Sequence, residues 1–423
     1  MIDTLIYIIL SMIYLFIVST QAYFIKLEGI SVRTIPIVFQ VIINSVIWVI
    51  SIFSFYKNNN KTGKLIVKRN FFSVIAVLVF IGIIGESLML NISKKTLGFD
   101  AIALYDARAK FLSYGLKFSQ MTQLTVYDDN NSYYYLLYPP FTSVVHYFWD
   151  NINLGINVGV LYSINLLLIG VVFLLMSLKK IKPWMALICT IFVVSDKVLF
   201  NLSLVEYTNL PFTLLIFSSV VLLSQYLKAK QKWQYYLSCI LISSSIWIRA
   251  IEPIWLVVTL SLLLHNQSEI KGALKNLFRY KLFLLCSLIS FFSWRIFVNL
   301  DIINQSIIKP DIFTIIEPIL GLFSGSLFSV LKVIISSWWK YLLFYVLTIL
   351  FVQKIKNDDI QFLRLTMIYS LVLYLVIIYF SSFVGSWWVG VAKDSISRSG
   401  SYLFPLAIYL LSYGIKFKNN KKE

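Results

Sequence analysis

The chain has 423 residues and a formal net charge of +18 at pH 7; 59% of its residues are hydrophobic and only 13% are charged. With a mean hydropathy of +0.81, this composition excludes a soluble globular domain and predicts an all-α polytopic membrane protein. The positive charge does not indicate a nucleic-acid partner, because the basic residues lie in short clusters between apolar runs. The expected environment is the lipid bilayer.

About twelve apolar runs are candidates for membrane-spanning helices, which need about 20 mostly apolar residues each. The predicted spans are 2–24, 35–56, 71–90, 155–178, 184–200, 209–227, 234–248, 252–265, 282–300, 334–353, 365–384 and 400–415. The fifth run carries Asp196 and Lys197 near its end, and the seventh and eighth are short and flank Arg249. The whole chain, 1–423, is expected to form one polytopic transmembrane domain.

Basic residues gather in alternate loops between the predicted spans. More than half of the 37 Lys and Arg residues lie in six clusters, at 57–69, 179–182, 228–232, 271–281, 354–364 and 416–422. Since such clusters mark cytoplasmic loops, both termini are expected in the cytoplasm. The heavy use of Ile, Asn, Lys, Phe and Tyr is typical of an AT-rich genome and favours a bacterial plasma membrane.

Four polar features then reach the opposite, extracytoplasmic side. They are the long loop 91–153, the segment 196–211, the turn that holds Arg249 and Glu252, and the two stretches 299–332 and 385–405. Topology alone therefore predicts that these segments converge on one site.

The stretch GFDAIALYDARAKFLSY, residues 98–114, carries two acids and two bases in a chain with few charges. Its DAIALYDARAK part is predicted to be a helix, because it contains good helix formers and neither Gly nor Pro. Asp100 can cap this helix or act as a general base. Asp106 and Lys110 are four residues apart and are expected to pair on one helix face.

Several of these segments resemble the GT-C superfamily of membrane glycosyltransferases. DAIALYDARAK is similar to the acidic motif of their first external loop, with Asp100, Tyr105, Arg108 and Lys110 at the matching positions. Further similar segments follow in the same order: YPPF at 138–141, EYTNLPFTL at 206–214, IWIRAIEP at 246–253 and SRSGSYLFPL at 397–406. The chain departs from the pattern in having Asp106 as an additional acid, Arg249 in place of a lysine and Asn209 in place of an aspartate.

The resemblance implies a GT-C-like fold whose long first external loop bears short helices, and an enzyme that is a glycosyltransferase. Its donor would be a sugar on a polyprenyl phosphate, such as undecaprenyl phosphate, transferred with inversion to a cell-envelope glycan, lipid or protein. No cofactor and no bound metal are implied, as in the branches of protein mannosyltransferases and aminoarabinose transferase.

The same resemblance, read with the residue chemistry, gives candidate roles. The catalytic base is Asp100 or Asp106, a choice that the sequence leaves open; Asp100 is favoured, because Asp106 is expected to pair with Lys110. Cations suited to the donor phosphate are Arg249, Arg398, Lys110, Arg108 and Lys393. Candidate substrate-binding residues are Tyr105, Tyr138, Glu206, Tyr207 and Glu252.

Other interpretations remain open. An Arg between two short apolar runs needs a partner, and for Arg249 that partner is either the phosphate or Glu252. His146 is expected in a wet loop or in packing, and Cys189, Cys239 and Cys286 are expected as small apolar residues. Alternative functions are a flippase or transporter of lipid-linked glycans or polysaccharides, and an O-antigen-type polymerase or ligase.

Overall fold

The computed structural model describes residues 1–58, 71–93, 101–118, 120–121, 139–152, 156–250, 252–266, 270–302, 326–381 and 400–419. Within these ranges the chain is helical and contains no strand. The helices are α1 (Ile2–Glu28), α2 (Ile35–Asn58), α3 (Phe71–Ser93), the π-helical η1 (Ala101–Asp106), α4 (Ala107–Ser113), α7 (Phe141–Ile152), α8 (Gly159–Leu178), α9 (Pro183–Val194), α10 (Lys197–Leu202), α11 (Asn209–Ala229), α12 (Lys232–Ile248), α13 (Ile254–Leu264), α14 (Ile270–Arg279), α15 (Lys281–Ile302), α17 (Ser326–Val352), α18 (Asp358–Ser381) and α20 (Leu403–Asn419).

Eight of the described helices are long and apolar enough to cross a membrane: α1, α2, α3, α8, α11, α15, α17 and α18. Three more apolar helices, α9, α13 and α20, are shorter. Each of the twelve apolar runs predicted from the sequence contains a helix. The prediction of an all-α, multi-pass membrane protein is therefore confirmed, whereas the crossing of the bilayer by all twelve runs stays a prediction.

The fifth predicted span, 184–200, was wrong as a single helix. It is divided into α9 and α10, and Asp196 stands between them as the N-cap of α10. One carboxylate oxygen of Asp196 accepts hydrogen bonds from the backbone N–H groups of Val198 and Leu199, each at 3.1 Å. The Tyr341 hydroxyl donates to the other oxygen at 2.6 Å. A carboxylate that satisfies the free N–H groups of a helix start favours a new helix over continuation of the old one.

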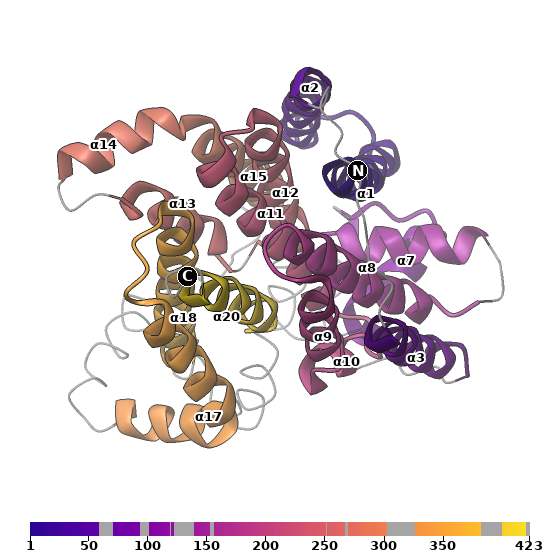
Figure 1. Cartoon of the computed structure of the whole chain (residues 1–423). Helices are drawn as coiled ribbons and strands as arrows, with labels where there is room; N and C mark the ends of the chain where they lie inside the picture. Colours follow the sequence, from indigo (N-terminus) through magenta and orange to yellow (C-terminus); the bar gives the residue numbers. More distant parts are fainter. Residues whose placement is uncertain are drawn as a thin grey trace.

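Helix α11 is the centre of the bundle (Figure 1), in contact with α8, α12, α18 and α20. Nearly all its residues are buried, as expected for a helix that is apolar on every side. Helix α3 instead lies at the edge and exposes much of its surface. It packs on α8 where Gly170 meets the ring of Phe80: a Cβ at position 170 would lie 2.6 Å from that ring. Such close helix contact at small residues is common in membranes.

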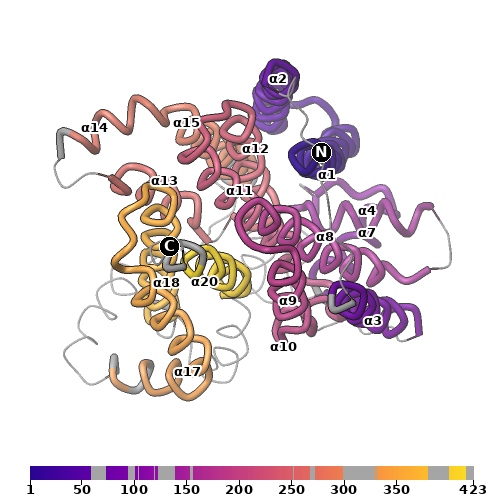
Figure 2. Tube along the Cα trace, in the orientation of Figure 1, coloured from indigo at the N-terminus to yellow at the C-terminus, as the bar shows by residue number. Residues whose placement is uncertain are grey.

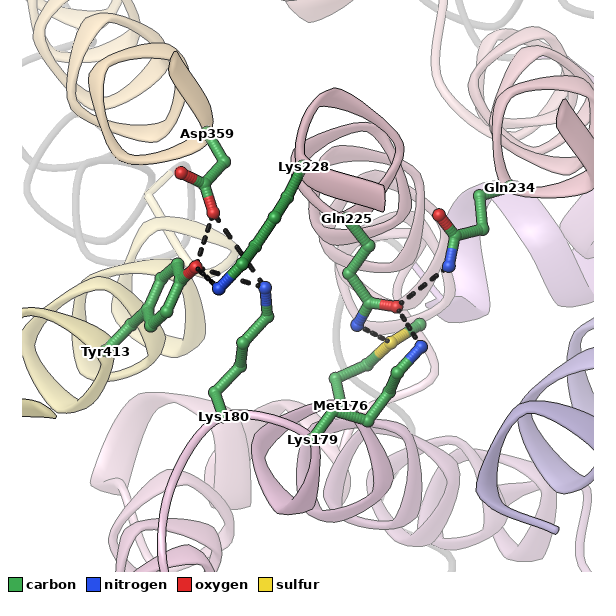
Figure 3. A network of polar contacts seen from close by, with 8 residues as sticks. All are labelled: Met176, Lys179, Lys180, Gln225, Lys228, Gln234, Asp359 and Tyr413. Atoms are coloured by element: carbon green, nitrogen blue, oxygen red, sulfur yellow. Dashed lines mark hydrogen bonds and ion pairs between the residues drawn. The ribbon is translucent and has the colours of Figure 1, made fainter. Parts of the chain in front are cut away.

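At one end of the bundle, polar side chains join helices that are far apart in sequence (Figure 3). Lys180 and Lys228 both donate to the Tyr413 hydroxyl, at 3.2 and 3.0 Å, and Tyr413 donates to Asp359 at 2.5 Å. Lys180 also pairs with Asp359 at 3.8 Å. We call Lys179, Lys180, Lys228, Asp359 and Tyr413 the lysine end.

The lysine end agrees with the predicted topology, in which the basic loops between spans share one side and the polar loops share the other. Lys179 pairs with Asp3 at the start of α1 and donates to Gln225 near the end of α11 at 2.8 Å. The starts of α1 and α18 thus meet the ends of α8, α11 and α20. Two of the basic clusters predicted to share one side, 179–182 and 228–232, do lie at one end of the bundle.

Candidate functional site

The described parts of several segments predicted to lie outside the membrane gather at the other ends of these helices. We call the described residues 101–118, 139–152, 203–208, 249–250 and 252–253 the loop end. Figure 2 shows α4 and α7 side by side next to α8, and η1 contacts both α4 and α7. The loop end is therefore built mainly from the described part of region 91–153, which packs against the starts of α8 and α11.

The stretch around the acidic motif is helical as predicted, but its first turn is a π-helix. Ala101, Leu104 and Tyr105 of η1 are buried, and Tyr207 packs against them. Two segments that the resemblance singled out, around Tyr105 and around Glu206, are therefore in contact. π-Helical turns are rare and occur often at functional sites.

Asp106 ends η1 and pairs with Lys110 one turn later. The Lys110 Nζ lies 2.9 Å from Asp106 Oδ2, and the Lys110 side chain is 65% exposed while that of Asp106 is 15% exposed. Hydrogen bonding to Asp106 and its negative charge raise the pKa of Lys110. The pair predicted from the spacing is confirmed, and it presents Lys110 to solvent.

Arg108, in contrast, is buried. Its guanidinium carbon lies 4.8 Å from the centroid of the Phe118 ring, a distance typical of a cation–π contact. The backbone N–H of Phe118 donates to the carboxylate of Glu28 at the end of α1. Arg108 is thus packed in the interior of the loop end, against Phe118. Its contact with a phosphate remains a prediction.

His146 of α7 is fully buried. Its Nε2 lies 2.9 Å from the Tyr162 hydroxyl of α8, and its ring meets the ring of Tyr105 edge-on, with centroids 6.5 Å apart. Burial lowers the pKa of His146 to about 4, although the charge of Asp106 acts to raise it. The packing role was predicted correctly and the wet loop was not; His146 is a neutral imidazole at pH 7.

Glu206 is also fully buried. Neither of its carboxylate oxygens accepts a hydrogen bond from another residue in the described part of the chain. Burial raises the pKa of Glu206 to about 7; the negative charge of Asp106 raises it as well, and the backbone N–H of Glu206 itself lowers it. A carboxyl group with this pKa can exchange a proton near neutral pH, a property that catalytic groups often have.

The turn after α12 contains the predicted ion pair. Arg249 Nη2 lies 2.6 Å from Glu252 Oε1, and Arg249 Nη1 donates to the Thr208 hydroxyl at 3.5 Å. The Tyr374 hydroxyl of α18 donates to Glu252 Oε2 at 2.8 Å. The ion pair between Arg249 and Glu252 is therefore confirmed, whereas a contact of Arg249 with a phosphate stays a prediction. The pair connects the end of α12 to the start of α11 through Thr208 and to α18 through Tyr374.

The segment before α20 joins the same region. Ser401 lies within 2.7 Å of the Thr213 hydroxyl of α11, and the ring of Tyr402 lies 5.9 Å from that of Tyr374. The predicted convergence is thus confirmed for the described parts of 91–153, 196–211, the turn at 249–252 and 385–405, whereas that of 299–332 stays a prediction. Four candidate residues lie outside the described residues, so their roles stay predictions: Asp100, Tyr138, Lys393 and Arg398.

Three residues in or beside the loop end were not among the candidates drawn from the sequence: His146 of α7, Asn91 of α3 and Tyr162 of α8. A signal for Asn91 was available, because Ser87 and Asn91 are four residues apart in a mostly apolar segment and so share one helix face. His146 and Tyr162 gave no comparable signal, since their contact depends on how α7 packs on α8. In the described part of the chain, no group of three or more His, Cys, Asp or Glu residues could hold a metal ion.

An apolar cavity of about 290 Å³ lies next to these polar residues, between α1, α7, α8 and α11. Its lining includes Met12 and Phe16 of α1, Ile164 of α8 and Leu215 of α11. Because Met12, Phe16 and Ile164 are exposed and belong to candidate spans, the cavity opens toward the bilayer. Tyr162, which also lines it, connects it to His146.

Comparison of the chain with known protein families, with curated proteins and with solved structures finds no match.

Proposed function

We propose that this chain is a membrane glycosyltransferase of the GT-C type. It would transfer a sugar from a polyprenyl-phosphate donor, with inversion, to an acceptor on the extracytoplasmic face. In this proposal twelve helices cross the bilayer of a bacterial plasma membrane, and the lysine end and both termini face the cytoplasm. The observation that supports it most is the apolar cavity, whose wall residue Tyr162 contacts His146 of the loop end.

The proposed occupant of the cavity is the first part of the polyprenyl chain. The cavity opens among residues of candidate spans, so its occupant would arrive from the bilayer. Its volume of about 290 Å³ is near the lower end of the range for ligand pockets. A chain lying there would bring its phosphate to the loop end, where Lys110 and Arg249 are the described cations proposed to bind it.

The proposed base is Asp106 or Asp100. It would accept the proton of the acceptor hydroxyl or amine as that group attacks the anomeric carbon and the bond from this carbon to the polyprenyl phosphate oxygen breaks. Cations near the departing phosphate would stabilise its negative charge in the transition state. His146 is not proposed as the base, because it is fully buried and its Nε2 lies 2.9 Å from the Tyr162 hydroxyl.

The proposal is tested by sugar transfer from synthetic polyprenyl-phosphate sugars by the purified chain. Asp106→Asn and Asp100→Asn keep the shape of each side chain and remove its basicity. The variant that lacks the base should lose about 10²- to 10⁴-fold in kcat. Asp150→Asn is the control, because Asp150 is exposed on α7 of the same region. Activity at the wild-type rate in both variants would show that neither acid is the base.

The cavity is tested separately with two matched substitutions. Ile164 lines the cavity and is 40% exposed, whereas Ile188 on α9 is 41% exposed and is not part of the lining. Ile164→Trp should raise the KM for the lipid-linked donor about tenfold or more, because the indole occupies the space of the chain. Ile188→Trp should leave it unchanged. An equal response of both variants would exclude the cavity as the donor site.

The same cavity also favours a second function, a flippase of lipid-linked glycans, because a flippase too must admit its substrate from the bilayer. Reconstitution of the chain into liposomes separates the two functions. A new glycosidic bond supports the transferase, whereas movement of a labelled lipid-linked glycan across the bilayer without bond formation supports the flippase.

A further inference from the structure

A network of buried polar groups fixes the orientation of Asn91. The Asn91 amide nitrogen donates to the Ser163 hydroxyl and to the backbone carbonyl of Ser203, both at 2.7 Å. A backbone carbonyl can only accept hydrogen bonds, so the amide nitrogen must be the atom that faces Ser203. The amide oxygen Oδ1 therefore points in the other direction.

In that direction lies the carboxyl group of Glu206. Both groups approach Gly159, the first residue of α8: a Cβ at position 159 would lie 2.6 Å from Asn91 Oδ1 and 3.1 Å from Glu206 Oε1. Asn91 and Glu206 have no exposed surface. Asn91 Oδ1 and both Glu206 oxygens have no hydrogen-bond donor among the described residues. Two of these buried acceptors, Asn91 Oδ1 and Glu206 Oε1, thus meet at a position where a Cβ would crowd them and glycine leaves room.

An ionised Glu206 would make this arrangement costly. A buried acceptor without a donor loses its hydrogen bonds to water and gains none in return, and a buried charge costs still more free energy. Among the described residues, the groups around Glu206 do not compensate for that charge: Asp106 of η1 is itself an acid, and Tyr162 of α8 and His146 of α7 are uncharged at pH 7. The cation Arg249, which contacts Thr208, is paired with Glu252. The nearby cation Lys110 is bound to Asp106.

One proton removes the conflict, because a protonated carboxyl group has an O–H that can donate. We propose that Glu206 is a buried proton-binding site, whose carboxyl proton is donated to Asn91 Oδ1 and so joins the 203–208 segment to α3 beside the start of α8. The raised pKa of Glu206, about 7, agrees with this geometry. Loss of the proton adds a negative charge to the loop end and removes one connection between these segments.

The site is tested by infrared titration of the purified full-length chain between pH 5 and pH 9. A protonated carboxyl group has a C=O stretching band that an ionised one lacks. The wild-type chain should show such a band that disappears with a midpoint near the pKa of about 7. Glu206→Gln should lack the band, and it should remain folded because its amide can donate to Asn91 Oδ1 in place of the carboxyl proton.

A second variant identifies the band independently. Asp106→Asn removes a negative charge that raises the pKa of Glu206, so the midpoint should move to lower pH while the band remains. A wild-type chain without a titrating band, a band that persists in Glu206→Gln, or a midpoint unaffected by Asp106→Asn would each overturn the proposal. The measurement involves no sugar transfer, so its outcome is independent of the proposed transferase activity.

Discussion

The lysine end and the loop end use their charges in different ways. At the lysine end, Lys179 pairs with Asp3 and Lys180 with Asp359, so that ion pairs connect separate helices. At the loop end the pairs Asp106–Lys110 and Arg249–Glu252 are only four and three residues apart. Charge pairing thus joins separate helices at one end, whereas these two pairs at the other end are local, and Glu206 and His146 are buried there as ionisable groups.

The largest effect is expected from breaking the lysine end. Asp359→Asn removes the carboxylate that faces Lys180 and accepts from Tyr413, leaving a buried lysine without its ion pair; such a change costs about 3–5 kcal/mol. Thermal unfolding in detergent should show a large fall in Tm. Asp358→Asn is the matched control, because Asp358 is the adjacent exposed acid and should cost little. Equal Tm values for the two variants would contradict a structural role for the lysine end.

The two ionisable groups of the loop end should give opposite pH dependences of stability. The pKa of Glu206 is raised from 4.5 to about 7, so its contribution to the free energy of unfolding falls as pH rises from about 4.5 to 7. The pKa of His146 is lowered from 6.5 to about 4, so its contribution rises as pH rises from about 4 to 6.5. The two slopes oppose each other.

Single variants should separate these slopes. Glu206→Gln should become more stable as pH rises from about 4 to 6.5, and His146→Gln should become less stable from about 4.5 to 7, each by about 1–3 kcal/mol. The wild-type chain should be flatter than either variant in unfolding measurements across this range. Parallel curves for the three proteins would contradict the assignment of these groups.

A smaller effect is expected from Gly159→Ala, which places a Cβ 2.6 Å from Asn91 Oδ1. Overpacking of this kind costs about 1–3 kcal/mol, so it should lower the Tm. Gly85→Ala in α3 is the control, since a Cβ there meets no atom within 4 Å. That control should be neutral or stabilising by up to about 1 kcal/mol. A Gly159→Ala chain as stable as the control would show that the close approach of Asn91 and Glu206 does not constrain position 159.

The smallest effect is expected at the exposed pair of the loop end. Lys110→Gln should change the free energy of unfolding by no more than about 0.5 kcal/mol, as is usual for exposed pairs four residues apart. Under the proposed function the same variant should raise the KM for the lipid-phosphate donor. A large loss of stability without a change in KM would assign Lys110 a structural role instead.

The helices were predictable because apolar runs of the required length stand out in the sequence, and the local pairs were predictable because three- and four-residue spacings place side chains on one helix face. The division of the fifth run at Asp196 was missed, since composition alone does not show whether a carboxylate caps a new helix. The burial of Glu206 was missed for a related reason. Its neighbours Asn91, Gly159 and Asp106 come from three other segments, and only packing brings them together.

The pair between Asp3 and Lys179 spans 176 positions of the chain, which bears on the order of assembly. Because chains are synthesised from the N-terminus, α1 enters the membrane long before Lys179 exists and cannot be fixed at the lysine end until α8 is complete. The last contact waits longer still, since Tyr413 belongs to α20. We therefore expect a ribosome-bound chain that ends before α20 to hold its earlier helices loosely and to gain full resistance to proteolysis only when that helix is inserted.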